Sequence, residues 1–179
     1  MSYDLKNKVV LITGGSIGIG AQVIEFLLKE NVKVCNYYGS INNAAIDMSS
    51  IAALFIDPLM PIYCGTKSYV LQFSTSLGQP EYYDRTGVRV ITMCFGATDT
   101  TLLQKTKLGN FDKVIEKDLV DNIKKHRFQK VESAAIGVVE ALKRGASGST
   151  WLSIADKPVR DVTDVIMKGY GVFSTLVFE

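Results

Sequence analysis

Short apolar runs alternate with amphipathic segments in the first part of the chain. The run from Val9 to Ile12 is apolar and β-branched, as expected for a strand that is buried on both faces of a parallel sheet. The next segment opens at Gly18 and places its apolar residues on one helical face, and a second apolar run follows at 32–35. Residues 1–35 therefore predict a strand, a glycine-rich turn, a helix and a strand, which together form one βαβ unit.

The pattern becomes irregular after Tyr38. Only about ten residues separate the second strand from the next plausible strand at 46–48, whereas a parallel crossover needs a dozen or more residues and usually a helix. We therefore expect an internal deletion around residues 36–50, with one or more central or edge elements of the sheet missing.

Regular alternation resumes at Pro61. The spacing of apolar residues and the glycine stops predict helices over 63–77, 111–125 and 132–144, and strands over 88–93 and 151–154. The tail beyond these elements is a mixed apolar stretch. This order predicts an α/β fold of the Rossmann-like type, a three-layer arrangement in which helices cover both faces of a parallel sheet. We expect residues 1–179 to form a single dinucleotide-binding domain.

Composition narrows the functional classes. A hydrophobic content of 47% supports one sizeable core, and a net charge of +2 gives no reason to expect binding to nucleic acid or to an anionic membrane. No apolar run approaches the roughly 18 residues of a membrane span. The three cysteines are far apart, with no spacing that suits zinc or a redox pair, and we expect no metal site. The chain is expected to be cytoplasmic.

The glycine-rich turn is the first candidate site. Thr13–Gly20 lies between a buried strand and the first turn of a helix, where glycine lets a diphosphate approach free backbone N–H groups. The alternative is that these glycines only permit tight packing of helix on strand. No Gly-Lys-Ser/Thr follows, which excludes a P-loop. Residues 35–38 contain no carboxylate and the turn contains no Arg or Lys, so NAD is the expected cofactor and NADP is not excluded.

A tyrosine and a lysine form the second candidate site. Tyr63 and Lys67 are four residues apart on a predicted helix, which places the phenol and the ammonium on one face. A nearby positive charge favours phenolate and brings the pKa of the phenol closer to neutrality, so Tyr63 could serve as acid and base. Ser50 ends the preceding strand and could hold a substrate oxygen. The alternative for Tyr63 and Lys67 is an amphipathic surface pair.

Together these motifs resemble the ordered signatures of the short-chain dehydrogenases/reductases. The matching motifs are Thr13-Gly14-x-x-x-Gly18-Ile19-Gly20, Asn42-Asn43-Ala44, Met48-Ser49-Ser50 and Tyr63-x-x-x-Lys67. Residues 4–8, 80–83 and 86–90 make the chain most similar to the branch that holds hydroxyprostaglandin dehydrogenase and insect alcohol dehydrogenase.

The resemblance implies an NAD(P)-dependent oxidoreductase that moves a hydride between a nicotinamide and a secondary alcohol or carbonyl compound. It implies that Tyr63 is the catalytic acid and base, that Lys67 lowers its pKa and holds the nicotinamide ribose, and that Ser50 positions the substrate. Thr100 matches a residue that contacts the nicotinamide carboxamide. The cofactor-binding residues implied by the resemblance are Gly14, Gly18, Ile19, Gly20, Asn42, Tyr63, Lys67 and Thr100.

The chain also departs from the family pattern. Ala45 replaces a glycine and Phe95 replaces a proline, and only six and four residues fill the intervals from Cys35 to Asn42 and from Ala45 to Ser50. The missing stretch would carry the relay asparagine, an acidic residue at the adenine and half of the usual interface of a homodimer. The alternative function is therefore a catalytically inactive, truncated family member, either a splice or gene-model product or a non-catalytic interaction protein.

Overall fold

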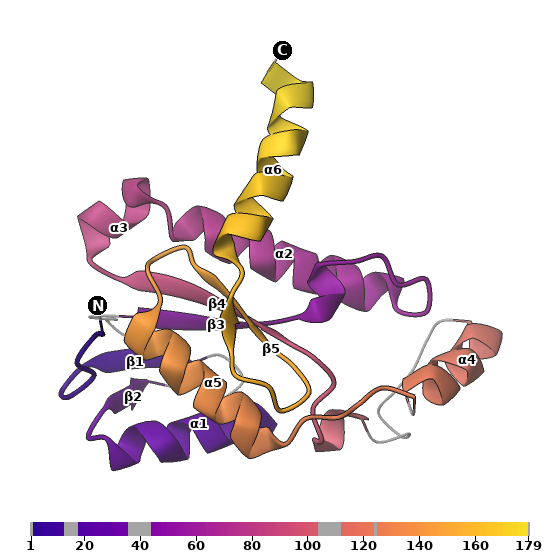
Figure 1. The fold of residues 1–179 in the computed structure, drawn as a ribbon, viewed down its shortest axis with the longest axis horizontal. Helices are drawn as coiled ribbons and strands as arrows, with labels where there is room; N and C mark the ends of the chain where they lie inside the picture. Colours follow the sequence, from indigo (N-terminus) through magenta and orange to yellow (C-terminus); the bar gives the residue numbers. More distant parts are fainter. Residues whose placement is uncertain (1, 13–17, 36–43, 104–111, 124, 179) are drawn as a thin grey trace.

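The computed structural model describes residues 2–12, 18–35, 44–103, 112–123 and 125–178. In this part of the chain the strands form a six-stranded sheet in the order β2-β1-β3-β4-β5-β6 (Figure 1). The first five strands of this order are parallel, and β6 is antiparallel to β5. The strands are β1 (Val9–Ile12), β2 (Lys33–Cys35), β3 (Ala44–Ser50), β4 (Arg89–Phe95), β5 (Thr150–Ser153) and β6 (Arg160–Asp161).

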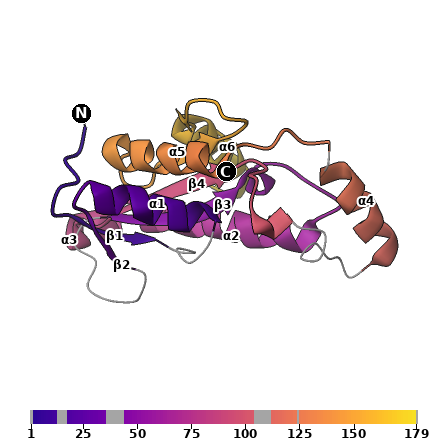
Figure 2. The same ribbon diagram turned by 90° about the horizontal axis from the view of Figure 1, so that it is seen from below.

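Helices cover both faces of the sheet, which confirms the predicted α/β, Rossmann-like class. Helices α1 (Gly18–Lys29) and α5 (Val131–Arg144) lie together on one face, and α2 (Pro61–Leu77) lies on the opposite face (Figure 2). Helix α3 (Pro80–Thr86) follows α2 after a short connection and leads into β4. The predicted βαβ unit is present as β1, α1 and β2.

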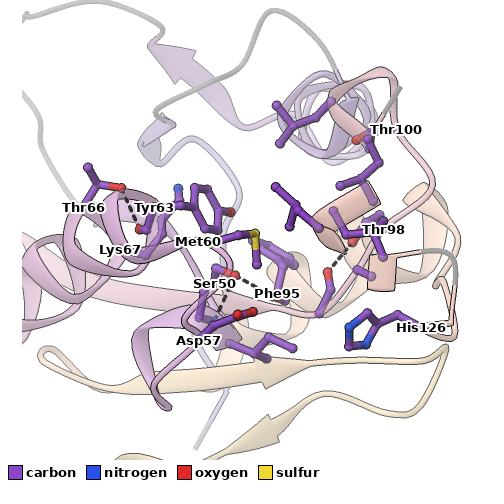
Figure 3. A pocket seen from close by; sticks show the side chains of 18 of the residues that line it. Ser50, Asp57, Met60, Tyr63, Thr66, Lys67, Phe95, Thr98, Thr100 and His126 are labelled. Carbon is purple, nitrogen blue, oxygen red and sulfur yellow. Dashed lines mark hydrogen bonds between the residues drawn. The ribbon is translucent and has the colours of Figure 1, made fainter. Parts of the chain in front are cut away.

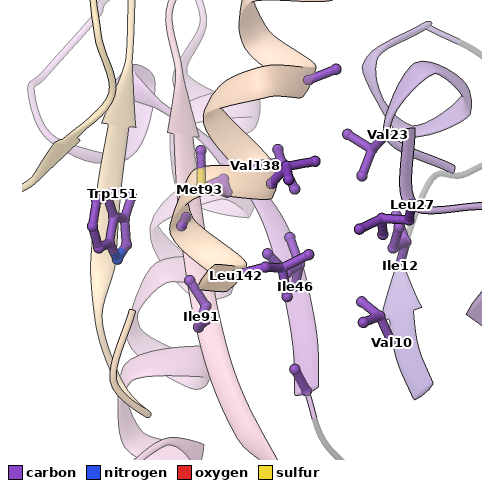
Figure 4. Close-up of a cluster of buried hydrophobic side chains, with 14 of the residues drawn as sticks. Val10, Ile12, Val23, Leu27, Ile46, Ile91, Met93, Val138, Leu142 and Trp151 are labelled. Atoms are coloured by element: carbon purple, nitrogen blue, oxygen red, sulfur yellow. The ribbon is translucent and has the colours of Figure 1, made fainter. Parts of the chain in front are cut away.

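The main core lies between the sheet and the α1–α5 pair (Figure 4). Alternate residues of the strands point toward this side, as a period of two requires. Alanine and glycine on the buried face of α5 let this helix lie close to α1 and to the sheet. The labelled core residues are Val10, Ile12, Val23, Leu27, Ile46, Ile91, Met93, Val138, Leu142 and Trp151, and each is at most 2% exposed.

Strand β3 occupies the centre of the sheet. Its residue Ile46 pairs in register with Ile12 of β1 on one side and with Ile91 of β4 on the other. Strands β2 and β3 lie on opposite sides of β1, so the strand order changes direction between them. The junction of β1 and β3 is therefore a topological switch point. In open α/β sheets, ligands bind in the crevice outside the carboxyl ends of the strands at such a point. The fold thus selects one edge of the sheet for a site.

Three elements differ from the sequence-based predictions in extent. Strand β3 spans 44–50 rather than 46–48. Its pairing with β1 and β4 also includes residues of low β propensity, which a local sequence pattern does not assign to a strand. Helix α4 (Lys113–Ile123) falls within the predicted 111–125. The apolar tail, for which no element is predicted, contains α6 (Thr163–Phe178), a helix with no buried residue that projects from the body of the molecule (Figure 1). Within the described ranges, no helix combines the length and apolar character needed to cross a bilayer.

Candidate active site

A cavity of about 780 Å³ opens at the carboxyl ends of β3 and β4, at the switch point. Its walls come from the first turn of α1, the first turns of α2, helix α4 and the short 3-10 helices η1 (Ile51–Ala53) and η2 (Thr101–Leu103). All sequence-predicted site residues that the structure describes line this one cavity: Gly18, Ile19, Gly20, Ser50, Tyr63, Lys67 and Thr100. Gly14 and Asn42 lie outside the described residues.

Gly18 begins α1 in a conformation that favours glycine. Its φ angle is +61°, and a Cβ atom built on it would lie 3.3 Å from Cγ2 of Thr100. The backbone thus approaches the Thr100 side chain at a distance that leaves little room for a larger residue. Since Gly18–Gly20 line the cavity, the first turn of α1, whose N–H groups have no partner within the helix itself, lies at its wall and is suited to a diphosphate.

Ser50 is held at the end of β3 by two backbone contacts. Its Oγ accepts a hydrogen bond of 3.2 Å from the N–H of Ala52, which caps η1, and can donate to the carbonyl oxygen of Phe95 at 3.4 Å. The Ser50 hydroxyl also lies close enough to the Tyr63 phenol to oppose part of the rise in the pKa of Tyr63. These contacts place the Ser50 hydroxyl beside the phenol, as the sequence predicts.

Tyr63 and Lys67 both face the cavity from the start of α2. Pro61 occupies the first helical position, where its missing N–H costs nothing. The Nζ atom of Lys67 lies 5.6 Å from the centroid of the Tyr63 ring and donates a hydrogen bond of 2.8 Å to the carbonyl oxygen of Met48 in β3. Helical spacing thus brings the phenol and the ammonium together (Figure 3). The Met48 carbonyl fixes the lysine.

Burial determines the ionisation of both groups. Burial raises the pKa of the Tyr63 phenol above its ordinary value, while the hydrogen bond with Ser50 opposes this shift in part. Burial also lowers the pKa of Lys67. The direction for Tyr63 is opposite to the lowering by Lys67 that the sequence predicts, because loss of hydration disfavours the phenolate and the ammonium is engaged by Met48.

The remaining walls of the cavity were missed by sequence reasoning. They are mainly apolar, with a few polar groups among them (Figure 3). The apolar members include Phe55, Leu59, Met60, Leu102, Leu103, Leu119 and Ile123, and the polar members include Asp57, Thr98 and His126. These residues come from segments far apart in the chain, so no local motif marks them. His126 is exposed but also lines the cavity.

No metal site is visible in the part of the chain that the structure describes. Among these residues, no group of three or more His, Cys, Asp or Glu side chains is arranged to hold a metal ion.

Comparison with known proteins connects this arrangement to dehydrogenases. No family model matches the chain. The chain is similar to alcohol dehydrogenase 1 of Ceratitis capitata, with 33% identity over 111 residues that make up 60% of the chain. This match covers 42% of the relative, so the chain spans less than half the length of the curated relative that it matches.

Solved dehydrogenase structures share the fold at low sequence identity. A 3-alpha-hydroxysteroid dehydrogenase from a Pseudomonas species, complexed with NADH, superposes with a TM-score of 0.62 and 17% identity, covering 83% of this chain and 96% of that one. L-sorbose reductase from Gluconobacter frateurii, complexed with NADPH and L-sorbose, gives a TM-score of 0.58 and 17% identity, covering 86% and 98%. These likenesses show the fold, and the sequence match is to an alcohol dehydrogenase.

Proposed function

We propose that this chain is a short-chain dehydrogenase/reductase that transfers a hydride between a nicotinamide cofactor and a secondary alcohol or carbonyl compound. One observation carries the proposal: a single cavity at the switch point is lined by Gly18, Ser50, Tyr63 and Lys67. A glycine turn or a Tyr-x-x-x-Lys motif alone is a weak signal. Their meeting in one cavity supports a dinucleotide site beside an acid–base site.

The side chains have distinct roles in the proposed reaction. During oxidation, Oη of Tyr63 accepts the proton of the substrate hydroxyl, and it returns a proton to the oxygen during reduction. Ser50 donates a hydrogen bond to the same substrate oxygen. Lys67, fixed by Met48, lies 5.6 Å from the centroid of the Tyr63 ring, and we assign it to the nicotinamide ribose. When bound, the nicotinamide supplies the hydride chemistry.

The residues present fit a dinucleotide. Gly18 has a positive φ and lies close to Thr100, and it has no side chain that would cover the backbone at the start of α1. There Gly18, Ile19 and Gly20 would hold the diphosphate. We assign Thr100 to the nicotinamide side of the site. Solved structures of the same fold hold NADH or NADPH, and we propose NAD for this chain, because residues 13–20 contain no Arg or Lys for a 2′-phosphate.

The proposed substrate is an alcohol or ketone with an apolar body. Leucine, isoleucine, phenylalanine and methionine side chains make up a large part of the cavity wall. Such a surface favours binding of an aliphatic or alicyclic group and excludes water from the reacting oxygen. A chain that carries a secondary hydroxyl, as in hydroxyprostaglandins, has this character.

The direct test measures dinucleotide binding and alcohol oxidation. NADH is titrated by fluorescence, and reduction of NAD⁺ is followed with a panel of secondary alcohols of increasing apolar size. We expect Tyr63→Phe to lose at least about 100-fold in kcat while NADH binding changes little. Tyr69→Phe is the matched control, because Tyr69 lies on the same helix and is exposed. Equal activity in the parent and in Tyr63→Phe would overturn the assignment of Tyr63.

A second candidate is an inactive, shortened member of the family. Two observations favour it. The single strand β3 contains both Ala44 of the Asn42-Asn43-Ala44 motif and Ser50 of the Met48-Ser49-Ser50 motif, and the chain spans only 42% of its relative. We propose an internal deletion around 36–50 within a single domain of residues 1–179. A parent that unfolds cooperatively but neither binds NADH nor oxidises any alcohol would favour this candidate. The transcript across 36–50 would show whether coding sequence has been skipped.

A further inference from the structure

Gln129 is a fully buried polar residue between α4 and α5. Only 1% of its surface is exposed, and its backbone pairs with the segment that follows β4. The N–H of Gln129 donates to the carbonyl oxygen of Ala97 at 2.9 Å, and its carbonyl oxygen accepts from the N–H of Asp99 at 2.9 Å. Gln129 and Thr98 therefore pair through their backbones in the way that residues of two neighbouring parallel strands do.

The side-chain amide of Gln129 extends this connection. Its Nε2 donates to Oγ1 of Thr98 at 2.9 Å and to the carbonyl oxygen of Ser153 at 3.0 Å, and its Oε1 accepts from Oγ of Ser153 at 3.1 Å. Both donor positions of the amide are thus in use, as is usual for a buried amide. We call Gln129, Thr98 and Ser153 the Gln129 network.

The Gln129 network holds two walls of the cavity. On one side, Thr98 belongs to the loop 96–100, which lines the cavity and ends at Thr100, beside Gly18. On the other side, Gln129 follows directly after the segment that contains His126 and α4, which also line the cavity. The carboxyl end of β5 anchors the network through Ser153.

We infer that Gln129 is a positioning residue that fixes the loop 96–100 against the segment after α4 and thereby sets the affinity of the site for its cofactor. Gln129 itself is absent from the cavity wall, so it acts through Thr98 and Thr100. The side chain is buried and its amide is fully paired, so an apolar residue of similar shape would remove the donor to Thr98 and the acceptor of the Ser153 hydroxyl. The effect on cofactor affinity rests on the proposed function, whereas the ordering of the loop does not.

The test compares Gln129→Met with Gln79→Met. Gln79 also donates through its amide, to the carbonyl oxygen of Thr75 at 2.8 Å, but it lies away from the cavity. We expect Gln129→Met to raise the dissociation constant for NADH about tenfold and Gln79→Met to change it less than about twofold. The pH profile of kcat should stay in place in both variants, because neither residue contacts Tyr63 or Lys67.

Two further measurements separate positioning from general loss of stability. Ser153→Ala removes the hydrogen bond that Oγ of Ser153 donates to Gln129 and leaves the cavity wall unchanged, and the double variant Gln129→Met/Ser153→Ala should bind NADH no more weakly than Gln129→Met alone, because both substitutions break the same connection. Hydrogen–deuterium exchange in the unliganded protein should increase in residues 96–103 of Gln129→Met and remain unchanged in β4.

The outcomes distinguish this inference from the proposed function. If the parent does not bind NADH, the proposed function fails, and exchange in 96–103 alone decides whether Gln129 orders the loop. If the parent binds NADH, then unchanged exchange in 96–103, an affinity loss equal to that of Gln79→Met, or additive effects in the double variant would each overturn the inference.

Discussion

Ser74 of α2 donates a hydrogen bond of 2.6 Å to the carboxylate of Asp47 in β3. The pair lies where the helix packs on the sheet, and Ser74 is 1% exposed. Burial raises the pKa of the Asp47 carboxyl, and the Ser74 hydroxyl opposes this shift only in part. An ionised carboxylate at this position therefore costs the folded state free energy.

Replacing Asp47 should stabilise the protein at neutral pH. Because the folded pKa of Asp47 is raised above the unfolded value, folding favours the protonated form, and stability falls as the pH rises from the unfolded pKa through the folded pKa. We expect Asp47→Asn to increase the free energy of unfolding at pH 7 by on the order of 1 kcal/mol and to remove this pH dependence. Urea denaturation from pH 3 to 8 checks this, with the exposed Asp84→Asn as control. A loss of stability in Asp47→Asn at pH 7 would contradict the expectation.

Arg89 should contribute strongly to stability despite its charge. Its guanidinium is buried and donates to the carbonyl oxygens of Gly145 at 2.6 Å and Leu142 at 3.1 Å, at the carboxyl end of α5, where the helix dipole favours a cation. We expect Arg89→Met to lose about 2–4 kcal/mol, because it leaves buried carbonyl groups unpaired. The control is Arg85→Met, where the arginine is exposed and the loss should be below about 1 kcal/mol. Equal denaturation midpoints for the two variants would argue against the role of Arg89.

Gly18 and Gly169 should respond in opposite directions to alanine. Gly18→Ala requires a positive φ and brings a Cβ within 3.3 Å of Thr100, so we expect a loss of about 1 kcal/mol and weaker NADH binding. Gly169 lies within α6 with open space around its Cα, so Gly169→Ala should gain about 0.5–1 kcal/mol from helix propensity. Thermal unfolding and NADH titration of both variants test the pair. Unchanged NADH binding in Gly18→Ala would remove the glycine turn from the cofactor site.

The pH profile of alcohol oxidation should report on Tyr63 and Ser50. The base form of Tyr63 is needed for oxidation, and burial raises its pKa, so kcat/KM should still be rising at about pH 9. Ser50→Ala removes the hydrogen bond that opposes this rise, so the profile should move to higher pH and kcat should fall about 10-fold or more. Ser68→Ala, an exposed serine on the same helix, should leave the profile unchanged. A profile for Ser50→Ala that coincides with the parent would disprove the coupling of the two hydroxyl groups.

The sequence predicts the fold well where local pattern and tertiary contact agree. The β1–α1–β2 unit is predictable because the apolar run from Val9 and the helical face of Val23 and Leu27 are the same residues that meet in the core. Helix α6 is harder to predict because Gly169 and Gly171 interrupt its pattern and no face of it is buried. The full length of β3 depends on pairing with β1 and β4, which no local signal encodes.

The candidate site is predictable only where chemistry imposes a motif. Tyr63, Lys67 and the glycines have fixed spacing along the chain, so a reader of the sequence can find them. The burial of Gln129 depends on Thr98 and Ser153, which approach it only in the folded state. The direction of the pKa shift of Tyr63 could not be predicted either. The sequence shows the nearby lysine but not how far folding removes the phenol from water.

The central position of β3 has a consequence for cooperativity. Within the described residues, the backbone hydrogen bonds that join β1 and β2 to β4 and β5 all pass through β3. A backbone disturbance in this strand would therefore reach the glycine turn and the tyrosine helix together. Damage at an outer strand such as β6 would leave both ends of the cleft aligned. The sheet depends on the seven consecutive residues of β3 to keep its two halves in register.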